Sequence, residues 1–208
     1  PIEILKPFFI LMTVKILTLN KLQNSQVKYF FSFFLLCSVI ILLVDQPDLG
    51  QSILLTGTWV FTVFISGVSI FYIIIFFLIF ITSLTSLLFL LPEKFGYIIN
   101  RLVTFFDPDQ GDKFQSSSAL DAIKLGGFTG QGMGEGILKE SVPEAHTDYV
   151  IAVISEEYGS IASMMIVSIF LYISFRIIKN CFNQDDQFVK ISLCGLATLL
   201  IFQTFIHA

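Results

Sequence analysis

Long apolar runs separated by short polar stretches dominate the sequence. The runs cover residues 4–19, 29–44, 51–67, 69–91, 149–175 and 188–206. A helix needs roughly 20 apolar residues to cross a bilayer, and fewer when flanking residues reach the interface, so each run predicts a membrane-spanning helix. The third and fourth runs meet near Gly67 and predict a tight helical hairpin. The pattern therefore predicts an all-α polytopic membrane bundle with about six crossings, the first and last of them truncated.

The polar stretch 92–147 divides the predicted helices. We expect about four helices in residues 1–91, a large loop in 92–147, and two helices in 148–208, the second truncated. Inside the loop, EKFGYIINRLVTFF and SSALDAIKL have the spacing of short amphipathic helices. GGFTGQGMGEG, which is about half glycine, predicts irregular backbone. A loop of this length is more often functional than a passive tether.

Composition supports the membrane interpretation. The chain of 208 residues is 55% hydrophobic, contains 24 Phe and has only 13% charged residues, which is too much apolar surface for one soluble core. Cys37, Cys181 and Cys194 are isolated in or beside apolar runs, as expected of small buried side chains. The sequence begins with Pro1 and ends inside an apolar run, and we expect an internal fragment of a longer chain.

The basic residues predict the orientation in the membrane. They cluster in two connections, with Lys15, Lys21 and Lys28 around the first and Arg176, Lys179 and Lys190 around the second. The turn DQPDLG at 45–50 has two Asp and no basic residue. Because basic loops stay in the cytoplasm, this turn and, by alternation, the loop 92–147 are predicted to lie outside.

Two loop motifs resemble known binding patterns but do not match them. DPDQGD at 107–112 has Gly111 at the fifth calcium-loop position and Ser118 at the twelfth, which predicts a solvated turn rather than a calcium site. The glycine run lacks the Gly-Lys-Ser/Thr ending of a phosphate loop. Asp48, which follows a proline at a helix start, fits a helix cap about as well as a substrate contact.

The stretch PEAHTDYVIAVISEEYG at 143–159 carries the strongest candidate chemistry. Asp148 stands where an N-cap belongs, but His146 and Thr147 crowd the same turn beside the glycine-rich segment. Glu156 lies roughly 12 Å further along a helix, and Glu157 points to a different side, so that one is structural and the other lines a cavity. Carboxylates inside lipid usually face a polar cavity or a partner, which suggests a cleft open to the outside.

Together these residues resemble the SEDS family, whose members include FtsW, RodA and SpoVE. PEAHTDYVIAVISEEYG resembles the family signature, PIEILKPFF its proline-x-glutamate-x-x-lysine helix start, QPDLG its external turn, and GGFTGQGMGEGILK its glycine-rich segment. PEAHTD and FQSSSALDAI resemble the FtsW branch of the alphaproteobacterial kind. The sequence departs from the family at Phe114-Gln115, where a tyrosine-glutamine pair is usual, and at Ser118 and Ile2.

The resemblance implies one SEDS domain of a ten-helix membrane glycosyltransferase that polymerises lipid II into peptidoglycan strands for cell division and cell-wall synthesis. It implies a multi-pass protein of the bacterial cytoplasmic membrane, with its active site facing the periplasm. The implied partners are a class B penicillin-binding protein transpeptidase and other divisome proteins, with no nucleic acid. The isolated fragment is expected to be inactive.

The resemblance also implies roles for individual residues. Asp148 would be the catalytic base. We expect support from Glu140, His146, Thr147, Glu156 and Glu157, and substrate binding by Gln115, Lys124, Lys139, Arg101 and Asp48. No His/Cys metal cluster exists in the sequence, so any metal would be Mg²⁺ or Mn²⁺ bridged mainly by pyrophosphate, and no organic cofactor is expected.

Two other classes of function stay open at the level of sequence. A polar cleft with intramembrane carboxylates also suits a lipid II flippase. A non-catalytic divisome scaffold would tolerate substitution of Asp148.

Overall fold

A computed structural model describes residues 2–19, 25–45, 49–90, 114–136 and 150–207. Within these ranges the regular elements are all helices, which confirms the predicted all-α class. They are α1 (Ile2–Thr18), α2 (Ser25–Asp45), α3 (Leu49–Ile65), α4 (Ile70–Leu90), α6 (Phe114–Gly126), α7 (Val150–Tyr158), α8 (Ser160–Cys181) and α9 (Gln187–His207).

Three stretches of the described chain are long and apolar enough to cross a membrane. They are Gln26–Leu43, Ser160–Cys181 and Gln187–Ile206. Gly50–Ile65 and Ile70–Ser83 are shorter apolar helices. The protein is therefore a polytopic membrane protein by helix length and composition, and the count of six crossings stays a prediction.

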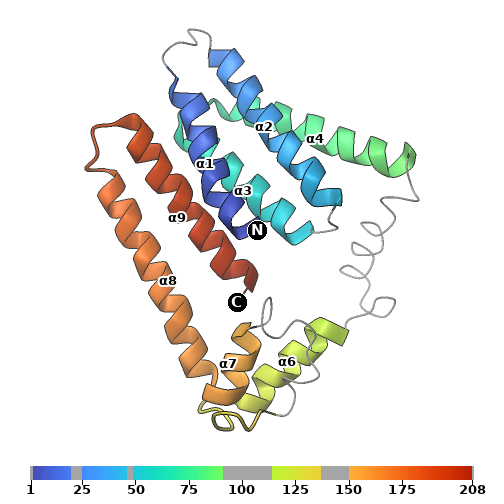
Figure 1. The fold of residues 1–208 in the computed structure, drawn as a ribbon, viewed down its shortest axis with the longest axis vertical. Coiled ribbons are helices and arrows are strands. Elements are labelled where there is room, and N and C mark those ends of the chain that lie inside the picture. The colour runs from blue at the N-terminus through green and yellow to red at the C-terminus, as the bar shows by residue number, and fades with distance from the viewer. Residues whose placement is uncertain (1, 20–24, 46–48, 91–113, 137–149, 208) are drawn as a thin grey trace. The chain divides into compact units, whose positions relative to one another are not determined.

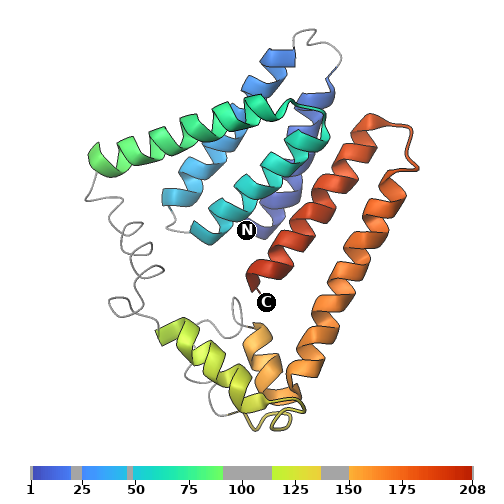
Figure 2. The same ribbon diagram turned by 180° about the vertical axis from the view of Figure 1, so that it is seen from behind.

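The helices belong to two compact units. The first contains residues 1–96 and 173–203, and the second contains residues 97–172 and 204–208. Helix α8 contributes residues to both. In the first unit, α1, α2 and α3 lie side by side in both views (Figures 1 and 2). Ile10, Val14, Leu36, Leu54 and Leu55 are almost completely enclosed at the centre of its core.

Small residues bring α9 close to α1 and α3 in this first unit. A Cβ added to Gly195 would lie 2.8 Å from Cγ2 of Ile10 and 3.0 Å from Oγ1 of Thr62. A Cβ added to Gly57 would lie 3.0 Å from the ring of Phe202. Glycine at such positions lets membrane helices approach closely enough for their backbones to pack.

Aromatic contacts join α2 to α3 and α4. The Phe33 and Phe76 rings stack with their centroids 4.8 Å apart, and the Trp59 indole N–H donates to the Ser32 hydroxyl at 2.8 Å. The expected tight hairpin between α3 and α4 is confirmed, and Gly67 in its turn has a φ of 89°. A positive φ of this kind is accessible to glycine without steric penalty.

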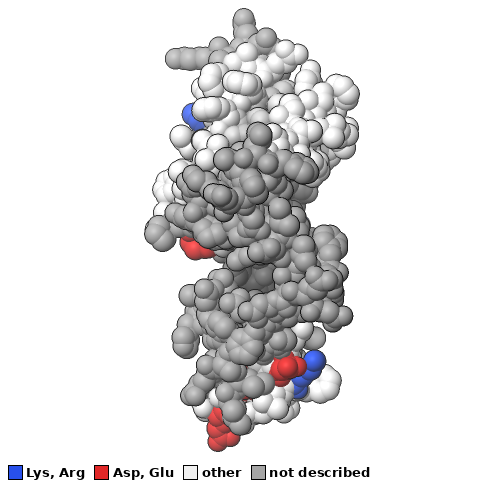
Figure 3. All heavy atoms as spheres, turned by 90° about the vertical axis from the view of Figure 1, so that its right-hand side faces the viewer, with Lys and Arg blue, Asp and Glu red and all other residues white. Residues whose placement is uncertain are grey.

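The outer surfaces of these helices are strongly apolar. Ile53, Phe64, Phe71 and Ile41 are each more than half exposed. In the upper part of Figure 3, the visible atoms of the described residues are almost all white, which marks residues other than Lys, Arg, Asp and Glu. Large exposed apolar surfaces on a soluble domain would drive association, so these faces are suited to contact with lipid or with other membrane helices.

The second unit corrects one prediction. The apolar run 149–175 was expected to form one helix, but it breaks at Gly159 into α7 and α8. Gly159 has a φ of 86°, and the carbonyl oxygen of Phe128 lies 2.1 Å from where its Cβ would be. The Ser160 amide donates to the carbonyl of Gly127 at 2.9 Å. The glycine-rich segment therefore occupies the space beside the break.

Candidate functional site

The glycine-rich segment 127–136 is bound to the end of α7 through the backbone. The Gln131 amide donates to the carbonyl of Glu156 at 2.9 Å, and the Gly132 amide donates to the carbonyl of Glu157 at 3.1 Å. These carbonyls belong to the last turn of α7, where the helix itself supplies no amide partner. The segment therefore completes the hydrogen bonding of the helix end and is attached to it.

Close backbone approach explains why glycine is needed here. A Cβ on Gly126, at the end of α6, would lie 1.9 Å from the carbonyl oxygen of Ser155. A Cβ on Gly130 would lie 2.2 Å from the carbonyl oxygen of Glu157. Any side chain at either position would collide with the backbone of α7. The prediction that the run has irregular backbone is confirmed, and the helix predicted at SSALDAIKL is confirmed as part of α6.

Glu156 is completely enclosed, whereas Glu157 beside it is half-buried. The carboxyl of Glu156 lies against Gly136, whose added Cβ would be 3.0 Å from its Cδ and Oε2. The buried hydroxyls of Ser155 on α7 and Ser163 on α8 lie 2.6 Å apart. Of the two glutamates, Glu156 is therefore the one held inside protein.

Of the other predicted site residues, two lie within the described ranges and the rest lie outside them. Lys124 is exposed on α6 and forms an ion pair with Asp121 at 3.2 Å. Gln115 falls in the first turn of α6. The remaining predicted residues lie outside the described ranges, namely Asp48, Arg101, Lys139, Glu140, His146, Thr147 and Asp148. The structure thus brings Glu156 and Glu157 to the glycine-rich segment, whereas Lys124 is exposed and paired with Asp121.

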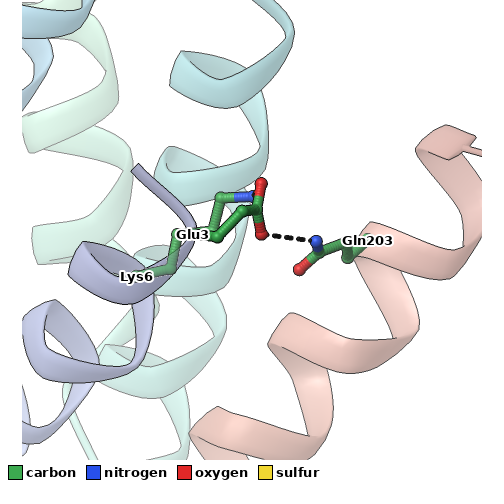
Figure 4. Close-up of polar contacts among 3 residues, drawn as sticks. All are labelled: Glu3, Lys6 and Gln203. Atoms are coloured by element: carbon green, nitrogen blue, oxygen red, sulfur yellow. Dashed lines mark hydrogen bonds and ion pairs between the residues drawn. The ribbon is translucent and has the colours of Figure 1, made fainter. Parts of the chain in front are cut away.

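The first unit contains a second polar cluster, formed by Glu3, Lys6 and Gln203, none of which was predicted as a site residue. The Lys6 ammonium is enclosed and lies 2.6 Å from Oε1 of Glu3. The other carboxylate oxygen of Glu3 accepts a hydrogen bond from Nε2 of Gln203 at 2.7 Å. Figure 4 shows the Gln203 side chain on α9 reaching toward Glu3 on α1.

Part of this cluster was readable from the sequence. Residues three apart lie on the same face of a helix, so Glu3 and Lys6 in an apolar helix predict an ion pair. Charged groups within membrane helices usually mark functional positions, because they are costly to bury without a partner. Gln203 gave no comparable signal, since an isolated glutamine in an apolar run does not indicate which distant residue it will meet.

Replacing Glu3 by leucine is expected to lower stability by about 3 kcal/mol, because the enclosed Lys6 ammonium loses its carboxylate partner. The expected value lies at the lower end of the range for broken buried pairs, since the Glu3 side chain is 57% exposed. The thermal unfolding midpoint of the full-length protein in detergent measures the change.

Asp121→Leu is a matched control, because Asp121 and Lys124 have the same acid-first spacing and are 60% and 74% exposed. Exposed pairs contribute little, so this variant should unfold close to the wild-type midpoint. Adding Lys6→Met to Glu3→Leu should recover much of the lost stability. Equal midpoints for Glu3→Leu and Asp121→Leu would contradict the expectation.

The described ranges contain no group of three or more His, Cys, Asp or Glu side chains that would bind a metal ion. Of the two acidic residues expected to be nearest the chemistry, Glu140 and Asp148, neither lies in these ranges. The expected Mg²⁺ or Mn²⁺ therefore stays a prediction.

Comparison with known proteins identifies the family. A model of the cell cycle proteins FtsW, RodA and SpoVE matches residues 1–208. The chain is 31% identical over 207 residues to the "Probable peptidoglycan glycosyltransferase FtsW" of Caulobacter vibrioides, a match that covers 100% of this chain and 52% of the relative. A protein of the same printed name from Buchnera aphidicola is 35% identical over 202 residues, covering 91% of this chain and 49% of the relative.

The chain thus spans about half the length of the curated relatives it matches. The family match extends over the segments on which the resemblance rested, from the helix start at Glu3 and Lys6 to the signature before and within α7. The buried glutamate, the glycine-rich segment and the polar cluster of α1 and α9 are therefore features of a member of the FtsW/RodA/SpoVE family, to which this chain belongs.

Proposed function

We propose that the whole protein is a peptidoglycan glycosyltransferase that polymerises lipid II at the outer face of the cytoplasmic membrane during cell division. The observation that carries this proposal is the match along the full chain to relatives named as peptidoglycan glycosyltransferases. The acidic signature directly before α7 supports it, because glycosyl transfer needs a positioned base.

In the proposed reaction, the carboxylate of Asp148 accepts the proton of the 4-hydroxyl of the acceptor GlcNAc. The oxygen attacks the anomeric carbon of the donor and forms the new glycosidic bond. The bond between that carbon and undecaprenyl pyrophosphate breaks, and the pyrophosphate leaves with the bonding electron pair. A positioned general base contributes typically 10²–10⁴-fold to such a step.

Other residues of the loop are assigned to the charge that develops on the leaving group. Lys139, Arg101 and Lys124 are proposed to face the pyrophosphate, since positive charge at that point stabilises the transition state. Lys124 would have to exchange its present partner Asp121 for the phosphate, which an exposed pair allows at low cost. Glu140 and His146 are proposed to orient the loop around Asp148, and a divalent cation on the pyrophosphate is part of the same proposal.

Charge and composition support the proposed membrane placement. The apolar outer faces of the helices suit the undecaprenyl chains of the substrate, and the basic connections near Lys21 and Lys179 favour the cytoplasmic side for those ends. The loop 92–147 then faces the periplasm, where lipid II is polymerised. A class B penicillin-binding protein is proposed as the partner that cross-links the product.

The test is polymerisation of purified lipid II in detergent by the full-length protein together with its cognate penicillin-binding protein. Glycan chains on a gel are the expected result. A flippase needs two membrane leaflets and would give no product in detergent. Absence of chains from a folded, partner-bound protein, combined with lipid II translocation in vesicles, would replace the proposed function with transport.

A further inference from the structure

The glycine-rich segment carries two large apolar side chains that the protein leaves uncovered. Phe128 is 78% exposed and Met133 is 77% exposed, the two highest values among the large apolar side chains of the described residues. The rest of the segment consists of glycine, threonine, glutamine and glutamate. Fully burying a Phe or Met side chain contributes about 1.5–3 kcal/mol, so both side chains are more stable in an apolar environment than in water.

Backbone hydrogen bonds place these two side chains beside the first residue of α8. Gly127, which precedes Phe128, accepts a hydrogen bond from the Ser160 amide at 2.9 Å. The residue before Met133 donates its amide to the carbonyl of Glu157 at 3.1 Å. Both side chains are therefore attached within one residue of a backbone contact with the α7–α8 junction.

The start of α8 marks a level in the membrane. The 22 residues Ser160–Cys181 rise about 33 Å, which is close to the roughly 30 Å thickness of the hydrocarbon core. A spanning helix of this length begins and ends near the two surfaces of that core. Ser160 therefore lies near the boundary between acyl chains and headgroups, and the backbone beside Phe128 lies near the same boundary.

The other end of α8 is also followed by an exposed aromatic ring. Phe182 comes directly after the helix and is 71% exposed, with the Lys190 ammonium 5.7 Å from the centre of its ring. Aromatic side chains gather at both surfaces of a bilayer, where an apolar ring reaches the acyl chains while neighbouring polar groups stay in water. At the Cys181 end the ring belongs to the next residue of the chain. At the Ser160 end, the glycine-rich segment brings Phe128 from a distant part of the sequence.

We propose that the glycine-rich segment is a membrane anchor, in which Phe128 and Met133 insert into the lipid at the bilayer surface where α8 begins. Side chains at such a boundary enter it by about 5–10 Å. Lipid is the favoured occupant because the first turns of α8 present Ile161, Met164 and Met165, which are also apolar and more than half exposed. The anchor would hold the α7–α8 junction at the membrane surface, whatever reaction the protein catalyses.

The test is photolabelling of the full-length protein in phosphatidylcholine nanodiscs, with a diazirine on the first carbons of the acyl chain of a tracer lipid. Neither lipid II nor a partner protein is present. Residues 127–136 should carry the lipid adduct. The matched control is the turn around Asp185, which is exposed but polar and follows the other end of α8, and it should carry much less. Absence of adduct from residues 127–136, in a protein that is labelled on α8, would overturn the inference.

Phe128→Ser/Met133→Ser removes both apolar side chains without changing a buried group. Labelling of residues 127–136 should fall to the level of the Asp185 turn, while labelling in the middle of α8 stays unchanged. Phe182→Ser makes the same kind of change at the other end of α8 and should leave the labelling of residues 127–136 as in wild type. If the double serine variant is labelled there as strongly as wild type, these side chains are not the anchor.

A protein partner is the competing occupant of this surface. If residues 127–136 gain no lipid adduct and become protected from amide exchange only when the penicillin-binding protein is added, the surface is a protein interface and the inference fails. The labelling result is also separable from the proposed function. Lipid adducts that depend on Phe128 and Met133 support the anchor even if the wild type forms no glycan, and an active polymerase without these adducts contradicts the anchor alone.

Discussion

Asp148→Asn in the full-length protein is expected to lower the rate of lipid II polymerisation by about 10²–10⁴-fold, the usual contribution of a positioned general base. An amide has nearly the shape of the carboxylate but does not accept the proton of the acceptor hydroxyl. Because substrate binding does not depend on that proton, kcat should fall while KM changes little. Initial rates of glycan formation at several lipid II concentrations separate the two constants.

Asparagine is the informative replacement because it caps helices about as well as aspartate does. If Asp148 only caps α7, Asp148→Asn should keep both wild-type turnover and the wild-type unfolding midpoint. Asp109→Asn, in the predicted turn DPDQGD, controls for the loss of one carboxylate and should leave turnover unchanged. A fully active Asp148→Asn protein would exclude general-base catalysis by this residue.

Gly159→Ala is expected to disrupt the packing of the glycine-rich segment on the α7–α8 junction and to abolish activity. Two effects add at this position. The φ of 86° disfavours any L-residue with a side chain, by about 1–2 kcal/mol. The new Cβ would also lie 2.1 Å from the Phe128 carbonyl oxygen, and a backbone atom cannot move aside as a flexible side chain does. The unfolding midpoint and amide exchange of residues 127–136 measure the damage.

Gly67→Ala separates the two effects, because Gly67 has nearly the same φ, 89°, with no heavy atom within 4 Å of its added Cβ. This variant should lose only the free energy that a positive φ costs alanine, and it should remain folded. The difference between the two alanine variants then measures the contact between the glycine-rich segment and the junction. Equal losses in both variants would show that the contact contributes nothing to stability.

The helices were largely predictable because each is encoded by its own apolar run. Residues 29–44, 51–67 and 188–206 lie almost entirely within single helices whose limits differ by a few residues. The α3–α4 hairpin was readable from Gly67, and α6 from the amphipathic spacing of SSALDAIKL. In each case the information is local, since helix length and glycine placement follow from neighbouring residues.

The break at Gly159 was not predictable in the same way. A single glycine within an apolar run is common in membrane helices and does not by itself end one. Here it ends the helix because the carbonyl groups of Gly127 and Phe128 occupy the space beside it. Those residues are about 30 positions away in the sequence, and periodicity carries no information about such contacts.

The polar residues were also predictable only in part. The Glu3–Lys6 pair is visible in the sequence as two opposite charges three residues apart. Its partner Gln203 lies 200 residues from Glu3, and only the packing of α9 beside α1 brings them together. Likewise, the presence of Glu156 and Glu157 was evident, but which of them is enclosed depends on tertiary packing around α7.

The break at Gly159 also bears on hydrophobic mismatch. A single helix from Val150 to Cys181 would rise about 48 Å at 1.5 Å per residue, whereas the hydrocarbon core is about 30 Å thick. To fit, such a helix would have to tilt by about 50°, beyond the range of roughly 0–40° seen for membrane helices. The 22 residues of α8 rise about 33 Å and can cross at a modest tilt. Because α7 ends at Tyr158, its residues do not add to the length of the helix that crosses the bilayer. The axis of α7 therefore does not have to run along the membrane normal.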